Sequence, residues 1–197
     1  AIARDHKRAF DNDRGPNTGG MGAYSPVPFV TDEIRDRALE TIIRPVAKAM
    51  QEEGYPFTGV LYGGLILTKD GPKVIEFNAR FGDPETEAVL PRLGGSFAQL
   101  LLNAASGSLS EADLVVKDDV AATVIVASGG YPGDYEKGKE ISGLAAASAD
   151  AFVFHCGTKE ADGRTLTSGG RVLSVTGLGA TLREAVDRAY ARIAGIS

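Results

Sequence analysis

Polar and apolar side chains alternate in the segment Val74 to Arg80, and the polar ones could do chemistry. In a strand, Glu76, Asn78 and Arg80 share one face, while the other face carries Ile75, Phe77 and Ala79. Carboxylate and amide oxygens are hard ligands that suit Mg²⁺, which usually takes only one or two protein ligands. An adjacent guanidinium could grip a phosphate through two parallel hydrogen bonds. We therefore consider a metal–polyphosphate site on one strand, with the apolar set in a core.

Other interpretations of this strand stay open. Alternating polar faces are common in strands that face solvent, so the pattern by itself favours an ordinary solvated face. The turn that follows carries Asp83 and Glu85, which could hold an amine substrate or support the metal. Taken alone, these two acids are more typical of a helix start, where the positive end of the helix favours negative charge.

A glycine-rich segment between Asp11 and Gly22 is a second candidate site. Gly19, Gly20 and Gly22 lack side chains, so successive backbone N–H groups could line an anion or substrate pocket. The segment has neither a Gly-Lys-Ser/Thr sequence nor a strand leading directly into a helix, so it is not a P-loop or a dinucleotide fingerprint. A surface turn is the default interpretation of such a loop.

The elements that must position these residues predict an α+β protein. We expect no regular element in the first thirty residues and a helix over 31–53 that Pro45 interrupts and Gly54 ends. Thr58 to Thr68 and Lys73 to Arg80 predict a hairpin with a bulge at Gly63-Gly64. Further helices are expected at 85–90, 96–105 and 182–194, and further strands at 120–128, 152–156 and 171–176. The last helix should begin with a capping box and bury Leu182, Val186, Ala189, Tyr190 and Ile193.

Composition narrows the class of protein. The 197 residues carry a formal net charge of −5, which argues against a nucleic-acid clamp. No apolar run reaches the roughly 18 residues that a bilayer span requires. One cysteine excludes an internal disulfide and a cysteine-built zinc site. His155 and Cys156 are interpreted as structural, and His6 as part of a solvated charged run. A reduced, cytoplasmic enzyme or binding protein is expected.

Several motifs resemble those of the phosphoribosylamine–glycine ligase family, also called glycinamide ribonucleotide synthetases. The resemblance rests on Asp5-His6-Lys7-Arg8, on the run from Gly15 to Pro26, on the run from Glu76 to Glu85, on Gly130-Tyr131-Pro132-Gly133 and on Gly169-Gly170-Arg171-Val172-Leu173. The metal motif alone would indicate only the wider ATP-grasp superfamily. The resemblance covers the whole chain but only about the C-terminal half of the family.

This resemblance implies an ATP-dependent carboxylate–amine ligase of purine biosynthesis. Glycine, 5-phosphoribosylamine and ATP would react through glycyl phosphate to give glycinamide ribonucleotide, ADP and phosphate. Glu76 and Asn78 would bind Mg²⁺ or Mn²⁺, and Arg80 would stabilise charge on the transferring phosphoryl group. The pockets for phosphoribosylamine and glycine would be shaped by Asp11, Asp13, Asn17, Thr18, Gly19, Gly20, Met21, Asp83 and Glu85.

The resemblance also predicts the organisation of the chain. Residues 1–105 would form the later part of the ATP-grasp core, an antiparallel-rich sheet with helices, and residues 106–197 a small α+β C-terminal domain. The family's N-terminal domains, which grip ATP, are expected in the parent protein, so we expect this chain alone to be inactive. The alternatives are another ATP-grasp carboxylate–amine ligase, or a non-catalytic binding module derived from such an enzyme.

Overall fold

A five-stranded antiparallel sheet joins the two ends of the sequence. The computed structural model describes residues 1–146 and 148–197. The strand order is β1-β4-β9-β13-β10, and every neighbouring pair is antiparallel. These strands are β1 (Arg4–Asp5), β4 (Gly22–Ser25), β9 (Val120–Ala127), β13 (Arg171–Gly179) and β10 (Ala151–His155). Segments from both sides of the boundary expected near 106–119 thus share one sheet, and the boundary itself stays a prediction.

The expectation of no regular structure in the first thirty residues is wrong. Besides β1 and β4, this segment contains the hairpin of β2 (Arg8–Phe10) and β3 (Arg14–Asn17). The hairpin turn uses positive φ angles at Asn12 and Asp13, of 58° and 56°. Short strands with glycine and proline carry little local signal. β4 forms because β9, about a hundred residues later in the chain, supplies its hydrogen-bonding partner.

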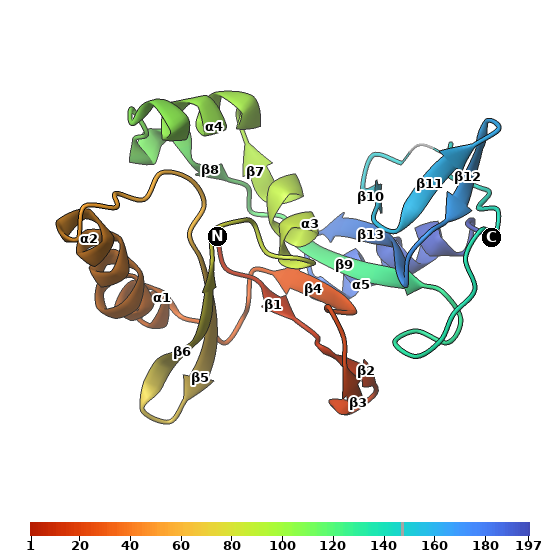
Figure 1. The fold of residues 1–197 in the computed structure, drawn as a ribbon, viewed down its shortest axis with the longest axis horizontal. Coiled ribbons are helices and arrows are strands. Elements are labelled where there is room, and N and C mark those ends of the chain that lie inside the picture. Colours follow the sequence, from red (N-terminus) through yellow and green to blue (C-terminus); the bar gives the residue numbers. More distant parts are fainter. Residues whose placement is uncertain (147) are drawn as a thin grey trace.

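The helical and hairpin predictions for residues 31–80 are confirmed. Helix α1 (Asp32–Ala38) passes through a π-helical segment, Leu39–Ile43, into α2 (Arg44–Glu52), so the regular helix is interrupted directly before Pro45. Gly54 follows with φ +86°. Strands β5 (Tyr62–Thr68) and β6 (Gly71–Asn78) pair with a register shift after Gly64. Figure 1 shows these elements to one side of the central sheet.

Short elements follow the β5–β6 hairpin and lead back to the central sheet at β9. The expected helices at 85–90 and 96–105 are confirmed as α3 (Glu85–Val89) and α4 (Phe97–Ser106), and α4 is capped by Ser96. The remaining elements are the 3-10 turns Leu90–Arg92 and Glu111–Asp113, the strand pair β7 (Leu93–Gly94) and β8 (Val115–Val116), and the hairpin of β11 (Thr158–Ala161) and β12 (Arg164–Thr167). None of the described helices has the length and apolar character needed to cross a membrane.

Helix α5 (Leu182–Ile193) covers the sheet beside β13 and β9. Its start agrees with the predicted cap, because Thr181 Oγ1 accepts a hydrogen bond from Glu184 N–H at 3.2 Å. The Glu184 carboxylate reaches the N–H of Ala180 rather than that of Thr181. The expected burial of Tyr190 is wrong, since this side chain is 57% exposed. The buried face carries Ala185 and Ala189 instead, because the helix lies too close to β13 for larger residues.

Substitution of Gly177 tests this close packing. A Cβ added at Gly177 would meet backbone atoms of α5, the carbonyl oxygen of Ala185 and, at 2.7 Å, the nitrogen of Ala189. Because backbone cannot move aside locally, Gly177→Ala should lower the free energy of unfolding by about 2 kcal/mol. Urea unfolding measures this loss. The control Gly129→Ala adds its Cβ to open space and should stay within about 0.5 kcal/mol; equal losses in the two variants would contradict the packing argument.

Candidate active site

Strand β6 presents Glu76 and Asn78 side by side. The Nδ2 amide of Asn78 donates a hydrogen bond to Glu76 Oε1 at 3.1 Å. Gly64 lies opposite Glu76 on β5, and a Cβ there would come within 3.0 Å of Glu76 Cγ, so a glycine keeps this face open. Arg80 lies two residues beyond the strand, and its guanidinium donates to the carbonyl of Phe81 at 2.7 Å. The structure therefore brings Glu76 and Asn78 into contact, whereas Arg80 follows the strand and is turned to the Phe81 carbonyl.

The donor chemistry of this pair fits a hard divalent cation. A carboxylate and an amide oxygen on neighbouring outward positions can supply two ligands, the number Mg²⁺ usually takes from a protein that also binds phosphates. Among residues 1–146 and 148–197, no group of three or more His, Cys, Asp or Glu side chains is arranged to hold a metal. An ion at Glu76 and Asn78 would thus depend on phosphate and water for its remaining ligands.

The expected burial of the other face of β6 is wrong. Ile75 is 66% exposed and Phe77 is 36% exposed, and Ala79 is exposed as well. The burial of β6 side chains does not alternate, because the register shift leaves Ile75 as an extra residue and because β5 and β6 form a separate two-stranded sheet. Helix α1 contacts this hairpin but does not bury these side chains. The side chains on both faces of the strand are therefore mostly exposed.

The glycine-rich segment divides into two parts. Asp11 and Asp13 lie at the exposed turn between β2 and β3, and Asn17 ends β3. Residues 18–21 form a tight loop fixed by backbone contacts. Thr18 N–H donates to the carbonyl of Lys7 at 2.7 Å, Met21 N–H to that of His6 at 2.8 Å, and Thr18 Oγ1 accepts from Gly20 N–H at 3.0 Å.

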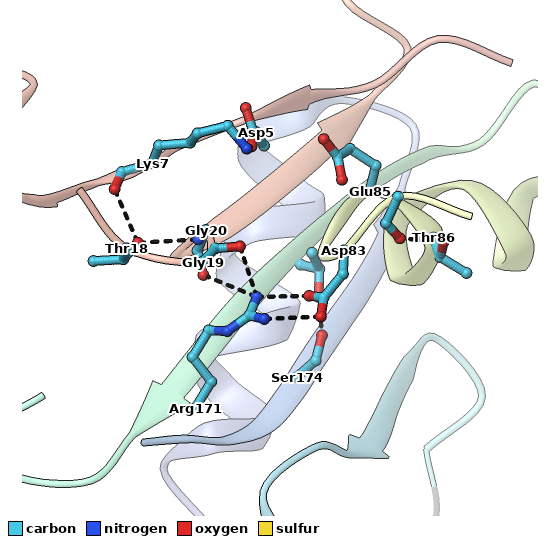
Figure 2. A network of polar contacts seen from close by, with 12 residues as sticks. Asp5, Lys7, Thr18, Gly19, Gly20, Asp83, Glu85, Thr86, Arg171 and Ser174 are labelled. Carbon is cyan, nitrogen blue, oxygen red and sulfur yellow. Dashed lines mark hydrogen bonds and ion pairs between the residues drawn. The ribbon is translucent and has the colours of Figure 1, made fainter. Parts of the chain in front are cut away.

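The turn before α3 faces this loop. Asp83 forms a two-pronged ion pair with Arg171, with oxygen–nitrogen distances of 2.6 and 2.8 Å. Glu85 is 8% exposed, and its Oε1 accepts a hydrogen bond from the Tyr62 hydroxyl at 2.7 Å. Figure 2 shows Asp83 beside the loop at Gly19 and Gly20, with Glu85 on the side facing Asp5 and Lys7. The turn and the loop, far apart in the sequence, thus form one polar region.

Two residues of this region escaped the motif analysis as functional candidates. Arg171 opens β13 and reaches the loop and the turn together. Its run Gly169-Gly170-Arg171-Val172-Leu173 contributed to the family resemblance but gave no role to the arginine itself. Lys7 contacts Asp5 at 2.5 Å. Burial lowers the Lys7 pKa, but the Asp5 hydrogen bond and the charges of Asp5, Glu85 and Glu76 outweigh this effect and raise it, so the ammonium stays charged.

The carboxylates that raise the Lys7 pKa also act on Tyr62. Burial, the hydrogen bond to Glu85 and the charges of Glu85, Asp5 and Glu76 all raise its pKa, so the hydroxyl stays neutral and donates to Glu85. Carboxylates from β1, β6 and α3 thus influence one another across the site. The arrangement can hold a cation between phosphates and can receive an amine.

Glu87 predicts a specific pH dependence of stability. Burial raises its pKa, as do the charges of Asp83 and Glu85, and its Oε2 is buried with no hydrogen-bond partner among the described residues. The native protein therefore holds this proton to higher pH than the unfolded chain. The Glu87 contribution to stability is fully present below the unfolded carboxyl pKa and is lost as pH rises through the folded pKa.

Glu87→Gln removes this proton equilibrium. The unfolding free energy of the variant, relative to the parent, should increase between about pH 4 and pH 7. Denaturant unfolding across that range measures the difference. Glu53→Gln, at an exposed position, is the matched control and should show no such trend. A flat difference for Glu87→Gln would contradict the raised pKa.

Comparison with known proteins matches both ends of the chain to one family. The family model for the ATP-grasp (A) domain of phosphoribosylglycinamide synthetase matches residues 1–86, and that for its C domain matches residues 121–197. The phosphoribosylamine–glycine ligase of Rhizobium meliloti is 50% identical over 197 residues, which are 100% of this chain and 47% of that protein. That of Escherichia coli O6:H1 is 52% identical over 199 residues, covering 100% of this chain and 46% of that protein.

Solved structures agree with the family models. Phosphoribosylamine–glycine ligase from Thermotoga maritima superposes with a TM-score of 0.85 at 37% identity, over 99% of this chain and 48% of that one. Biotin carboxylase from Campylobacter jejuni, with a TM-score of 0.68 at 14% identity over 90% of this chain and 39% of that one, shares the fold. The expected α+β architecture of the ATP-grasp type is confirmed. The chain spans about half the length of the curated relatives it matches. It belongs to the phosphoribosylglycinamide synthetase family.

Proposed function

We propose that this chain supplies the metal-binding strand of a phosphoribosylamine–glycine ligase, together with its pockets for glycine and phosphoribosylamine, here called the acceptor pockets. The reaction would join glycine to 5-phosphoribosylamine at the expense of ATP, giving glycinamide ribonucleotide, ADP and phosphate. The observation that carries the proposal is the open Glu76–Asn78 pair on β6, next to Arg80 and to the polar region of the loop and turn. The names of relatives about 50% identical support the choice of substrates.

The phosphoryl-transfer half of the reaction is assigned to β6. Glu76 and Asn78 would hold Mg²⁺ or Mn²⁺, which supplies charge neutralisation for the polyphosphate when it is bound. A glycine carboxylate oxygen attacks the γ-phosphorus of ATP, ADP leaves, and glycyl phosphate forms. Arg80 would turn from the Phe81 carbonyl to the transferring group and offset its negative charge.

The amide-forming half of the reaction is assigned to the loop and the turn. The amine of phosphoribosylamine attacks the carbonyl carbon of glycyl phosphate, and phosphate leaves. Glu85, buried and hydrogen-bonded to Tyr62, would hold an amine group, and Asp83, paired with Arg171, would shape the pocket beside it. Residues Asn17, Thr18, Gly19, Gly20 and Met21 would line the phosphoribosyl pocket, with Asp11 and Asp13 at its outer rim. Catalysis would come from positioning and electrostatics.

The ATP clamp is proposed to come from the part of the relatives that this chain does not cover. A metal-binding strand whose side chains are mostly exposed has little to hold a nucleotide by itself. We therefore propose that the chain alone does not turn over and that the complete enzyme works in the cytoplasm.

A chimera tests this function. It joins the chain to the part of the Rhizobium meliloti ligase that the alignment leaves uncovered. With Mg-ATP and freshly generated phosphoribosylamine, labelled glycine should enter glycinamide ribonucleotide, whereas labelled alanine should not. Turnover with another carboxylate or amine in place of these substrates would instead indicate a different ATP-grasp ligase. A folded chimera that makes no product with any pair would favour a non-catalytic module.

A further inference from the structure

We propose that Arg171 is a positioning residue for the ligase reaction: it fastens the glycine-rich loop to the Asp83 turn and so sets the shape of the acceptor pocket. The inference rests on the proposed function and deepens it. It concerns a side chain from β13, in the C-terminal part of the chain, that forms no hydrogen bond or ion pair with β6 among the described residues.

The contacts of Arg171 join three distant segments. Its Nη1 donates to Asp83 Oδ1 at 2.6 Å and to the carbonyls of Gly19 and Gly20 at 2.9 and 3.4 Å. Its Nη2 donates to Asp83 Oδ2 at 2.8 Å. Figure 2 shows the guanidinium between the loop and the turn, with bonds to both. One planar group thus fixes two backbone carbonyls and a carboxylate, a geometry that lysine cannot reproduce.

The glycines of the loop fit this arrangement. A Cβ at Gly19 would lie 2.8 Å from Cζ of Arg171, and a Cβ at Gly20 would collide with the ring of Pro84. Gly20 also has φ +107°, but Gly19 lies outside the left-handed region. At Gly19, therefore, the guanidinium, and not backbone conformation, is what excludes a side chain.

A second attachment ties the same strand to the same segment. Thr176 Oγ1 on β13 donates its one proton to the carbonyl of Glu87 at 2.9 Å, and it lies 2.9 Å from Thr123 Oγ1, from which it can accept a hydrogen bond inside the sheet. The loop has its own support, since Gly19 N–H donates to the Tyr131 hydroxyl at 3.2 Å. Strand β13 is thus attached to α3 through Thr176. From the same strand, Arg171 binds both the turn before α3 and the loop, and so sets the distance between them.

If Arg171 had a purely structural role, its removal would lower the stability of the fold, but the geometry predicts only a small loss of stability. Asp83 is half exposed and Arg171 is 21% exposed, so solvent partly screens this two-pronged ion pair, which should contribute only about 1 kcal/mol to folding. Gly19→Ala needs only the far end of a flexible side chain to move. Both Gly19→Ala and Arg171→Ala should therefore change the unfolding temperature by no more than about 3 °C. Their effect should fall on substrate affinity.

A double-mutant cycle in the chimera tests the proposal. Gly19→Ala and Arg171→Ala should each raise KM for phosphoribosylamine and for glycine about tenfold, while KM for ATP stays within about twofold. Because both act through the guanidinium, the double variant should match Arg171→Ala. Arg171→Lys should recover little, and Arg183→Ala, which removes an exposed ion pair on α5, should have no effect. Multiplicative effects in the double variant, or an unchanged KM in Arg171→Ala, would overturn the proposal.

Hydrogen exchange on the 197-residue chain itself, without the added part of the chimera, tests this inference separately from the proposed function. Arg171→Ala should speed exchange of the amides at residues 18–21 about tenfold, with no change at α5. If the parent chimera is inactive, the ligase function and the kinetic role of Arg171 fall together, and the exchange data still decide whether the loop is fastened. If the chimera is active but exchange at the loop is unaltered, only the positioning role is overturned.

Discussion

Glu76→Gln in the chimera is expected to lower kcat for ADP release at least about 100-fold. The substitution keeps the volume of the side chain and an oxygen that can accept the bond from Asn78, but it removes the negative charge assigned to the metal. Because Glu76 is exposed and makes no ion pair within the described residues, the unfolding temperature should not change.

Steady-state ADP release at saturating Mg-ATP measures this effect, and the paramagnetic signal of free Mn²⁺ measures metal affinity. Glu52→Gln, at an exposed position of α2, is the control and should retain full activity. Full activity with unaltered Mn²⁺ affinity in Glu76→Gln would contradict the assignment of the metal site to β6.

Arg92→Leu is expected to cause the largest loss of stability, about 3 kcal/mol. Arg92 is 7% exposed, and its guanidinium donates to the carbonyl of Asp119 at 2.5 Å, to Ser25 Oγ at 2.6 Å and to the carbonyl of Lys117 at 3.2 Å. Ser25 Oγ in turn donates to the carbonyl of Ile2. The substitution leaves buried acceptors unpaired where three segments meet.

Urea unfolding gives this loss directly, and Arg183→Leu on the exposed side of α5 should stay within about 0.5 kcal/mol. If Arg92→Leu does not fold, Arg92→Lys should fold with an intermediate stability. A loss below about 0.5 kcal/mol in Arg92→Leu would contradict a structural role for this arginine.

The sequence predicted those features of the fold that depend on residues close together in the chain. The cap at Thr181, the break before Pro45 and the bulge at Gly64 each depend on a few neighbouring residues. Strand β4 was missed because its partner β9 lies about a hundred residues later, and β1 was missed because it pairs with β4. The face of β6 was misjudged for a related reason, since alternation gives the period of a strand but not which side is covered.

The candidate site shows the same division. Motif spacing placed Glu76 beside Asn78 because both lie on β6, but it did not show that Asp83 faces Arg171 while Glu85 faces Tyr62. That Asp83 meets Arg171, 88 residues later, and that the loop at Gly19 meets both, depends on the packing of β13. Asp11 and Asp13 lie on a hairpin turn that the glycine-rich pattern did not reveal. Their roles, like those of the other site residues, stay predictions.

ADP release by the chain alone and by the chimera, measured in parallel, tests the central claim most directly. Both reactions contain Mg-ATP, glycine and freshly generated phosphoribosylamine. The account predicts no release by the chain alone and release by the chimera that depends on both acceptor substrates. Turnover by the chain alone that disappears in Glu76→Gln, or a folded chimera that binds Mg-ATP and releases no ADP, would contradict it.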